Sequence, residues 1–106
     1  MVTAEFITAG LELAKGAGRA MYAKIGERDA CGFGWTEVYV DRTNSKQAKE
    51  LIKAGFRKDW KPKCLTFWDP AGVPTQSVSV KEAGADAFAG YLTSLGLKAY
   101  GCSRLD

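Results

Sequence analysis

The sequence predicts a single α+β domain in which a leading helix precedes a core of alternating strands and helices. Apolar residues recur every three or four positions in three segments, as in amphipathic helices, and strand-like runs lie between and after them. A length of 106 residues, with 46% hydrophobic and 25% charged residues, is typical of one globular domain. We therefore expect one domain over residues 1–106, with the leading helix in 1–29 and the core in 30–106.

Residues 4–25 are expected to form the leading helix, with Thr3 as a candidate N-cap. Its weak point is glycine, since Gly10, Gly16 and Gly18 each cost roughly 1 kcal/mol relative to alanine inside a helix. This helix therefore has to dock on another element to be stable.

The first strand is expected at residues 32–40. Side chains two positions apart on a strand point the same way, so Phe33, Trp35 and Tyr39 share one face. Whether this face is surface or core depends on what covers it.

A second helix should begin after Asn44 or Ser45, either of which can cap it, and should end at Gly55 in a left-handed conformation. Its buried stripe is expected to comprise Ala48, Leu51 and Ile52. Residues 63–68 predict another strand, and a short extended piece at 75–78 is expected to complete a hairpin with it.

A capping box is predicted at the start of the last helix, where Ser79 would accept a hydrogen bond from the Glu82 amide. This helix should run to Leu95 and stop at Gly96. Its expected buried residues are Val80, Ala83, Ala87, Phe88, Tyr91, Leu92 and Leu95. A final strand at 97–102 follows, and the residues on one of its faces are Lys98, Tyr100 and Cys102.

Without the leading helix, the predicted order is strand, helix, strand, strand, helix, strand. This order predicts a ferredoxin-like βαββαβ two-layer sandwich, with both helices on one face of a four-stranded, mainly antiparallel sheet. The other face is open unless residues 4–25 cover it. If they do cover it, the aromatic residues belong to the core.

Basic charge is concentrated in residues 46–63, which hold seven Lys or Arg against two acids, a local balance of +5 in a chain of net charge +3. Positive charge beside exposed rings suits the phosphates and bases of single-stranded nucleic acid. The candidate ligand-binding residues are Phe33, Trp35, Tyr39, Arg57, Lys58, Trp60, Lys61, Lys63, Trp68, Tyr100 and Arg104. Two roles remain open for Arg104, namely pairing with a nearby carboxylate or gripping a phosphate.

The absence of histidine excludes Ser/His/Asp and Cys/His catalysis and His-ligated zinc. Three cysteines without a Cys-x-x-Cys pair indicate reduced, buried thiols rather than a disulfide framework. No apolar stretch is long enough to span a bilayer. We therefore expect a cytoplasmic protein that needs no cofactor or metal and does not bind membranes.

An enzymatic role would need Cys102 or Cys31 as a nucleophile, or Glu37 and Asp41 as paired carboxylates. Residues four apart on a strand lie roughly 13 Å apart, which is too far to flank one bond. Arg104 would lower the pKa of the Cys102 thiol, but no helper base is visible in the sequence. A non-enzymatic binding role is therefore favoured.

Gly32-Phe33-Gly34-Trp35 resembles the aromatic central strand of RNA recognition motifs, although Cys31 and Thr36 depart from that motif. Gln76-Ser-Val-Ser79, the helix after it and Leu97-Lys-Ala-Tyr100 are similar to the last helix and strand of sporulation-related repeat domains. That similarity implies the split βαββαβ arrangement, in a family that binds denuded glycan strands of cell envelopes, but an envelope-targeting signal is missing here.

The whole chain resembles a group of small, mostly uncharacterised bacteriophage proteins. Its marks are Cys31-Gly-Phe-Gly-Trp35, the helix after it, the Gln76 to Glu82 segment and the ending Tyr100-Gly-Cys-Ser-Arg-Leu-Asp106. The resemblance implies a viral protein that acts in the cytoplasm of an infected bacterium.

From these features we expect a small protein that binds single-stranded nucleic acid or a nucleotide. The alternative is an effector or inhibitor that docks on a host bacterial protein, or on a second copy of itself as a homodimer. Trp60 and Trp68 would then be the binding hot spots.

Overall fold

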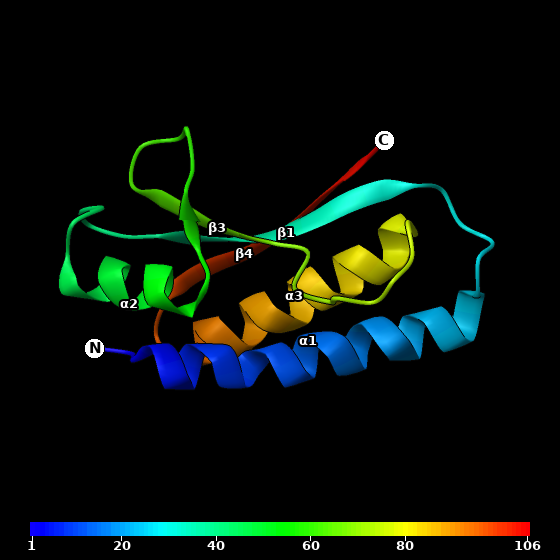
Figure 1. Cartoon of the computed structure of the whole chain (residues 1–106), viewed down its shortest axis with the longest axis horizontal. Helices are drawn as coiled ribbons and strands as arrows, with labels where there is room; N and C mark the ends of the chain where they lie inside the picture. The colour runs from blue at the N-terminus through cyan, green and yellow to red at the C-terminus, as the bar shows by residue number, and fades with distance from the viewer.

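The computed structural model describes all 106 residues and contains a four-stranded antiparallel sheet with three helices on one side of it (Figure 1). The elements in chain order are α1 (Ala4–Ile25), β1 (Gly32–Tyr39), α2 (Lys46–Ala54), β2 (Arg57–Lys58), β3 (Cys64–Trp68), α3 (Val78–Ser94) and β4 (Lys98–Leu105). The predicted α+β class with an N-terminal helix first is confirmed. None of the helices combines the length and the hydropathy that a membrane-spanning segment requires.

The strands lie in the order β2-β3-β1-β4, and all neighbours are antiparallel. Trp35 on β1 lies opposite Trp68 on β3 and opposite Cys102 on β4. Glu37, two residues on, lies opposite Thr66 and Tyr100. Because directly paired residues share a face of the sheet, this register gathers aromatic side chains from three strands on one face.

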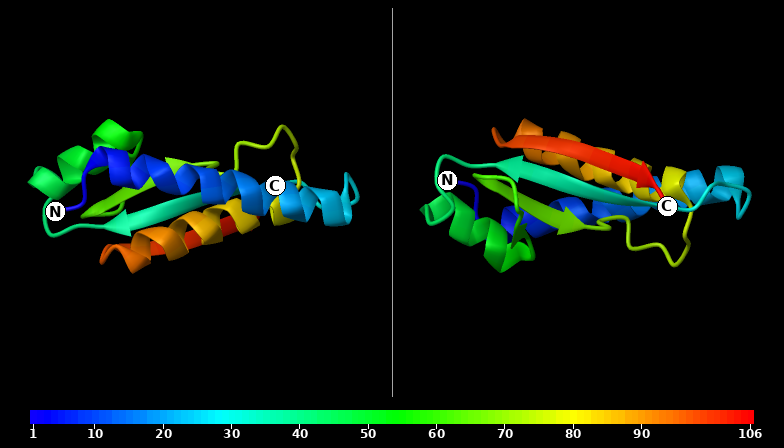
Figure 2. Two further views of the ribbon diagram at one scale, coloured as in Figure 1. Left: turned by 90° about the horizontal axis from the view of Figure 1, so that it is seen from below. Right: turned by 90° about the horizontal axis from the view of Figure 1, so that it is seen from above.

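Helix α1 lies against α3 and α2, on the side of these helices that faces away from the sheet (Figures 1 and 2). Its Ile7 and Ala14 are fully buried in the core. Its start is tied to α2, because the Ala4 N–H donates to Oε1 of Glu50 at 2.8 Å. The leading helix therefore leaves the second face of the sheet uncovered.

Three phenylalanines form the centre of the core between the helices and the sheet. Phe56 follows α2, Phe67 belongs to β3 and Phe88 belongs to α3. Their ring centroids are 5.4 to 5.9 Å apart. Val38 of β1 and Leu65 of β3 are fully buried in the same cluster, so the helix-facing side of the sheet is apolar.

Two of the three glycines that weaken α1 as an isolated helix are required for its packing. A side chain at Gly10 would overlap the ring of Tyr91, and one at Gly18 would lie 2.9 Å from Cβ of Ala71. Gly16, in contrast, faces open space. Helix α1 therefore lies close to its neighbours only because side chains are missing at these contacts.

The predicted ends of α2 are confirmed, but one part of its predicted buried stripe is wrong. The Ser45 side chain accepts a hydrogen bond from the Ala48 N–H at 3.1 Å, and Gly55 ends the helix with a φ of 119°. Ile52 is exposed, because α2 is covered on one side only, where Ala48 and Leu51 lie. In α1, Thr3 occupies the N-cap position but its side chain makes no capping bond.

Two predictions about residues 75–82 are wrong. Residues 75–78 form no strand, and only an isolated bridge joins Ser77 to Cys31, so the hairpin partner of β3 is β2. The N-cap of α3 is Ser77 instead of Ser79, since the Ser77 Oγ accepts from the Val80 N–H. Ser77 also donates to Asp29 at 2.6 Å, a bond that fixes the earlier start of the helix. The Glu82 carboxylate accepts a hydrogen bond from the Ser103 hydroxyl and does not form the predicted capping box.

We expect Ser77→Ala to lower the free energy of unfolding by more than the roughly 1 kcal/mol of a lost N-cap side chain, because it also removes the hydrogen bond to Asp29. Ser79→Ala should lower it less, because the backbone N–H of Ser79, which alanine keeps, donates to Asp29 at 2.8 Å. Urea unfolding of both variants measures the difference. An equal loss in the two would contradict the assignment of the cap.

Candidate functional site

Aromatic side chains of β1, β3 and β4 lie together on the sheet face that the helices leave uncovered. Trp68 stacks on Trp35, with centroids 5.5 Å apart and planes 12° from parallel, and it also contacts Phe33 at 5.6 Å. Tyr39 and Tyr100 meet edge to face at 5.9 Å. We call these five residues the aromatic face. Trp68 and Tyr100 are each 56% exposed, so this face is in contact with solvent.

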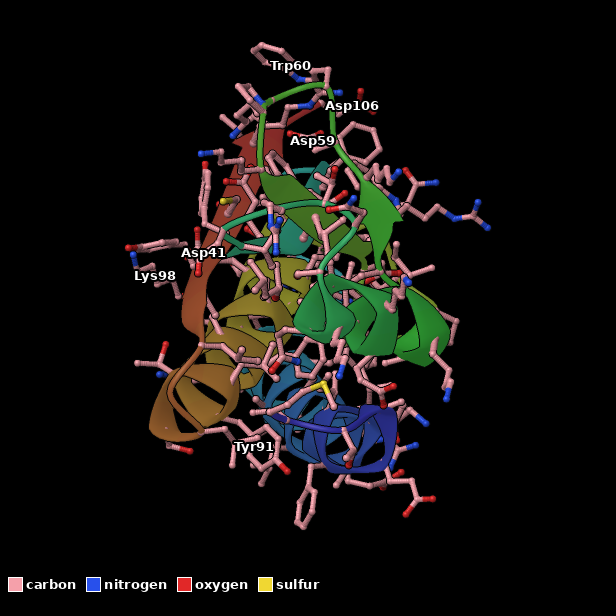
Figure 3. The ribbon with its side chains drawn as sticks, turned by 90° about the vertical axis from the view of Figure 1, so that its left-hand side faces the viewer. Asp41, Asp59, Trp60, Tyr91, Lys98 and Asp106 are labelled. Carbon is pink, nitrogen blue, oxygen red and sulfur yellow. The ribbon has the colours of Figure 1, made fainter.

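The loop between β2 and β3, residues 59–63, extends away from the sheet on the side opposite the helices (Figure 1). Trp60 stands at its tip and is 87% exposed (Figure 3). Trp35, Trp60 and Trp68 line one shallow pocket between this loop and the aromatic face. They are the three tryptophans of the chain, so its indole signals all come from this site.

Four cationic side chains surround the rings, namely those of Arg57, Lys61, Lys98 and Arg104. The Arg104 guanidinium lies over the Phe33 ring, 5.3 Å from its centroid, and forms no ion pair. Of the two roles left open for Arg104, pairing with a carboxylate is therefore not observed. A guanidinium held on a ring keeps N–H groups free for an anion.

Glu37 lies at the centre of the face, is 4% exposed, and accepts three hydrogen bonds. The donors are Trp35 Nε1 at 3.0 Å, the Tyr39 hydroxyl at 3.1 Å and Lys61 Nζ at 2.7 Å. Burial raises the pKa of the Glu37 carboxyl, but the hydrogen bonds from Lys61, Trp35 and Tyr39 outweigh it and the net pKa is lowered. The ionised carboxylate therefore holds two rings and one cation of the site in place.

A lowered pKa at Glu37 predicts a specific loss of stability in acid. The contribution of this carboxylate is present above its ordinary pKa, near 4.5, and disappears as the pH falls through the lower pKa of the folded state. We expect Glu37→Gln to flatten the decline of stability in this acid range, measured as the urea midpoint against pH. Asp29 also contributes to the loss of stability in acid, since hydrogen bonds from Ser77 and Ser79 lower its pKa to about 2. This contribution is the same in the wild type and in Glu37→Gln. Parallel curves for the two proteins would refute the prediction.

Neither the Cys64 thiol nor the Cys102 thiol is activated as a nucleophile, and Cys31 is exposed, so the prediction of three buried thiols is wrong for Cys31. Burial raises the pKa of the Cys64 thiol to about 11, with Glu37 and Asp59 adding to the shift. Burial also raises the pKa of the Cys102 thiol, so the expectation that Arg104 lowers it is wrong. Glu37, Asp59 and Cys64 are, however, close enough together to hold a metal ion.

The structure brings together most of the predicted ligand-binding residues. On the face or its rim lie Phe33, Trp35, Tyr39, Arg57, Trp60, Lys61, Trp68, Tyr100 and Arg104. Lys58 lies opposite Leu65 and thus on the helix side of the sheet, and Lys63 lines a second hollow between residues 41–44 and the loop 59–63. The sequence-based site omitted Glu37 and Lys98, although their positions in the strand alternation place both beside the rings.

Comparisons of the chain with protein families, with curated proteins and with solved structures find no match.

Proposed function

We propose that the protein binds single-stranded nucleic acid on the aromatic face and catalyses no reaction. The observation that carries this proposal is the position of α1, which packs behind α2 and α3 and leaves Trp68 and Tyr100 exposed. Exposed rings on a sheet offer stacking surfaces for bases, and every base has a face that can stack. In a duplex the bases are already stacked inside, so unpaired strands are the better ligand.

The charges around the rings support the same ligand. Arg104 lines the pocket that holds the tryptophans, Lys98 lies beside Tyr39 and Tyr100, and neither of them forms an ion pair. A cation next to each group of rings places phosphates within reach while the bases stack.

The sheet topology supports a more specific fold assignment for the core. Residues 30–106 are proposed to be a ferredoxin-like βαββαβ unit. The supporting observations are the strand order β2-β3-β1-β4 with antiparallel neighbours, and the location of α2 and α3 on one side of the sheet.

A salt titration tests the proposed binding. Tryptophan fluorescence is followed while a short oligonucleotide is added at several salt concentrations, and the signal arises only at the site. If the three cations without an ion pair, Arg57, Lys98 and Arg104, contact phosphates, the plot of log K against log salt should have a slope of about −2, since each contact contributes roughly −0.7. A slope near zero, or no binding tighter than about millimolar at low salt, would remove the proposal.

A second candidate function is docking on another protein, and the exposure of Trp60 favours it. An indole that is 87% exposed at the tip of a loop is suited to fill a pocket on a partner. Strand β4 also forms an eight-residue edge of the sheet, to which a second copy can add a strand. Sedimentation at increasing protein concentration tests the homodimer. Docking would be favoured by two results together. The protein forms dimers that Trp60→Ala or a substitution in β4 dissociates, and it has no affinity for oligonucleotides.

A further inference from the structure

Three side chains with metal-binding atoms meet at the base of the loop 59–63. Glu37 comes from β1, Cys64 from the start of β3 and Asp59 from the loop itself. Each offers one ligand atom, and these three atoms lie within 4.8 Å of one another. Glu37 and Cys64 are almost completely buried and Asp59 is partly exposed, so most of the cluster is shielded from solvent.

Two of the three groups lack an adequate partner. Oδ2 of Asp59 is closed off from solvent and has no hydrogen-bond partner. The fully buried Cys64 thiol has a single long contact, 3.9 Å to the carbonyl oxygen of Leu65. Native proteins retain few buried polar atoms without partners, and an unfilled ion site is one explanation for those they retain.

The local charge is also out of balance. Glu37 is paired with Lys61 at 2.7 Å, whereas Asp59 forms no ion pair. The cluster therefore carries one excess negative charge while the Cys64 thiol is protonated. A divalent cation that binds Cys64 as a thiolate, with the thiol proton passing to solvent, would make the group of three ligands, Lys61 and metal neutral.

We propose that Cys64, Asp59 and Glu37 form a binding site for a divalent cation that accepts sulfur as well as oxygen ligands, with zinc as the best fit. Zinc takes thiolate and carboxylate ligands at about 2.0 to 2.3 Å, which sets ligand atoms roughly 3.3 to 3.8 Å apart around a tetrahedron. The three ligand atoms are at most 4.8 Å apart, so they need to approach one another by about 1 Å to reach these tetrahedral distances. Hard cations such as magnesium prefer oxygen ligands alone and fit this set less well.

A bound cation would fix the loop that carries Trp60 and Lys61. Asp59 directly precedes Trp60 and lies two residues before Lys61, so its coordination would hold the loop against β1 and β3. The site shares Glu37 with the aromatic face but uses none of its rings as ligands, so a cobalt band reports metal binding separately from oligonucleotide binding.

Titration of the full chain with Co²⁺, followed by competition with Zn²⁺, tests the site. Cobalt bound to a thiolate gives a charge-transfer absorption band, and we expect one equivalent to produce it and zinc to remove it. Cys64→Ser should abolish the band, and Asp59→Asn should weaken cobalt binding by about tenfold or more. Cys102→Ser and Cys31→Ser are the matched controls, since neither thiol belongs to the cluster.

No thiolate band in the wild-type chain, or a band that survives in Cys64→Ser, would overturn the proposal. Circular dichroism shows whether each variant is folded, and Asp59→Asn decides the question if Cys64→Ser is not. Trp68→Ala should keep the cobalt band, because Trp68 is not among the ligands. Failure of the oligonucleotide experiment with an intact cobalt band would thus reject the binding function alone.

Discussion

Replacing Trp68 by alanine is expected to weaken the binding of a short single-stranded oligonucleotide by about 5- to 150-fold, because a stacked base contributes roughly 1 to 3 kcal/mol. Trp68 contacts both Phe33 and Trp35, so it links the rings of β3 to those of β1. Its removal takes away one stacking surface and frees the other two rings to move. Trp68→Phe keeps a ring at this position and should lose much less affinity.

Fluorescence anisotropy of a labelled oligonucleotide measures these affinities. The matched control is Phe6→Ala, which removes an aromatic ring of similar exposure, 62%, from α1 on the far side of the molecule. Its affinity should equal that of the wild type. An equal loss in Phe6→Ala, or no loss in Trp68→Ala, would show that the aromatic face is not the binding surface.

Gly84→Ala is expected to destabilise the fold by about 1 to 3 kcal/mol, although alanine is the better helix former. A Cβ at Gly84 would overlap Cβ of Ala71 and approach its backbone to 2.7 to 2.8 Å. Backbone atoms cannot rotate away as the end of a long side chain can, so α3 or the segment around Ala71 has to shift. Gly90→Ala in the same helix meets nothing within 4 Å and should stabilise the fold by up to about 1 kcal/mol.

Urea or thermal unfolding of the two variants measures whether Gly84→Ala lowers the stability and Gly90→Ala raises it. The contact matters for the site because Ala71 follows β3 by three residues, so packing of this segment on α3 holds the end of the strand that carries Trp68. If Gly84→Ala proves as stable as Gly90→Ala, then α3 and the segment around Ala71 are not in close contact at Gly84.

The sequence predicted those elements whose signals are local. Ser45 and Gly55 define α2 because a capping hydroxyl and a left-handed glycine act on their own helix ends. The start of α3 could not be predicted in this way, since it depends on Asp29, which lies 48 residues from its partner Ser77. The location of α1 also depends on tertiary contacts, because the glycine pattern shows that close packing occurs but does not identify Tyr91 as the partner of Gly10.

The same limit applies to the site. The alternation of side chains placed Phe33, Trp35 and Tyr39 on one face, and the structure does so as well. The role of Glu37 was not predictable, because its cation, Lys61, comes from a loop 24 residues away. The pKa shift of the Cys102 thiol was predicted in the wrong direction. Arg104, its neighbour in the sequence, lies over the Phe33 ring, and burial raises the pKa of the thiol.

The most direct measurement of the central claim uses the indole N–H resonances of Trp35, Trp60 and Trp68 in a proton–nitrogen correlation spectrum. A short single-stranded oligonucleotide is added at low salt, and the amides of α1 serve as the internal control. We predict that all three indole signals shift and that the α1 amides do not, because the aromatic face and α1 lie on opposite sides of α2 and α3. Unchanged indole signals, or shifts confined to α1, would contradict nucleic-acid binding on this face.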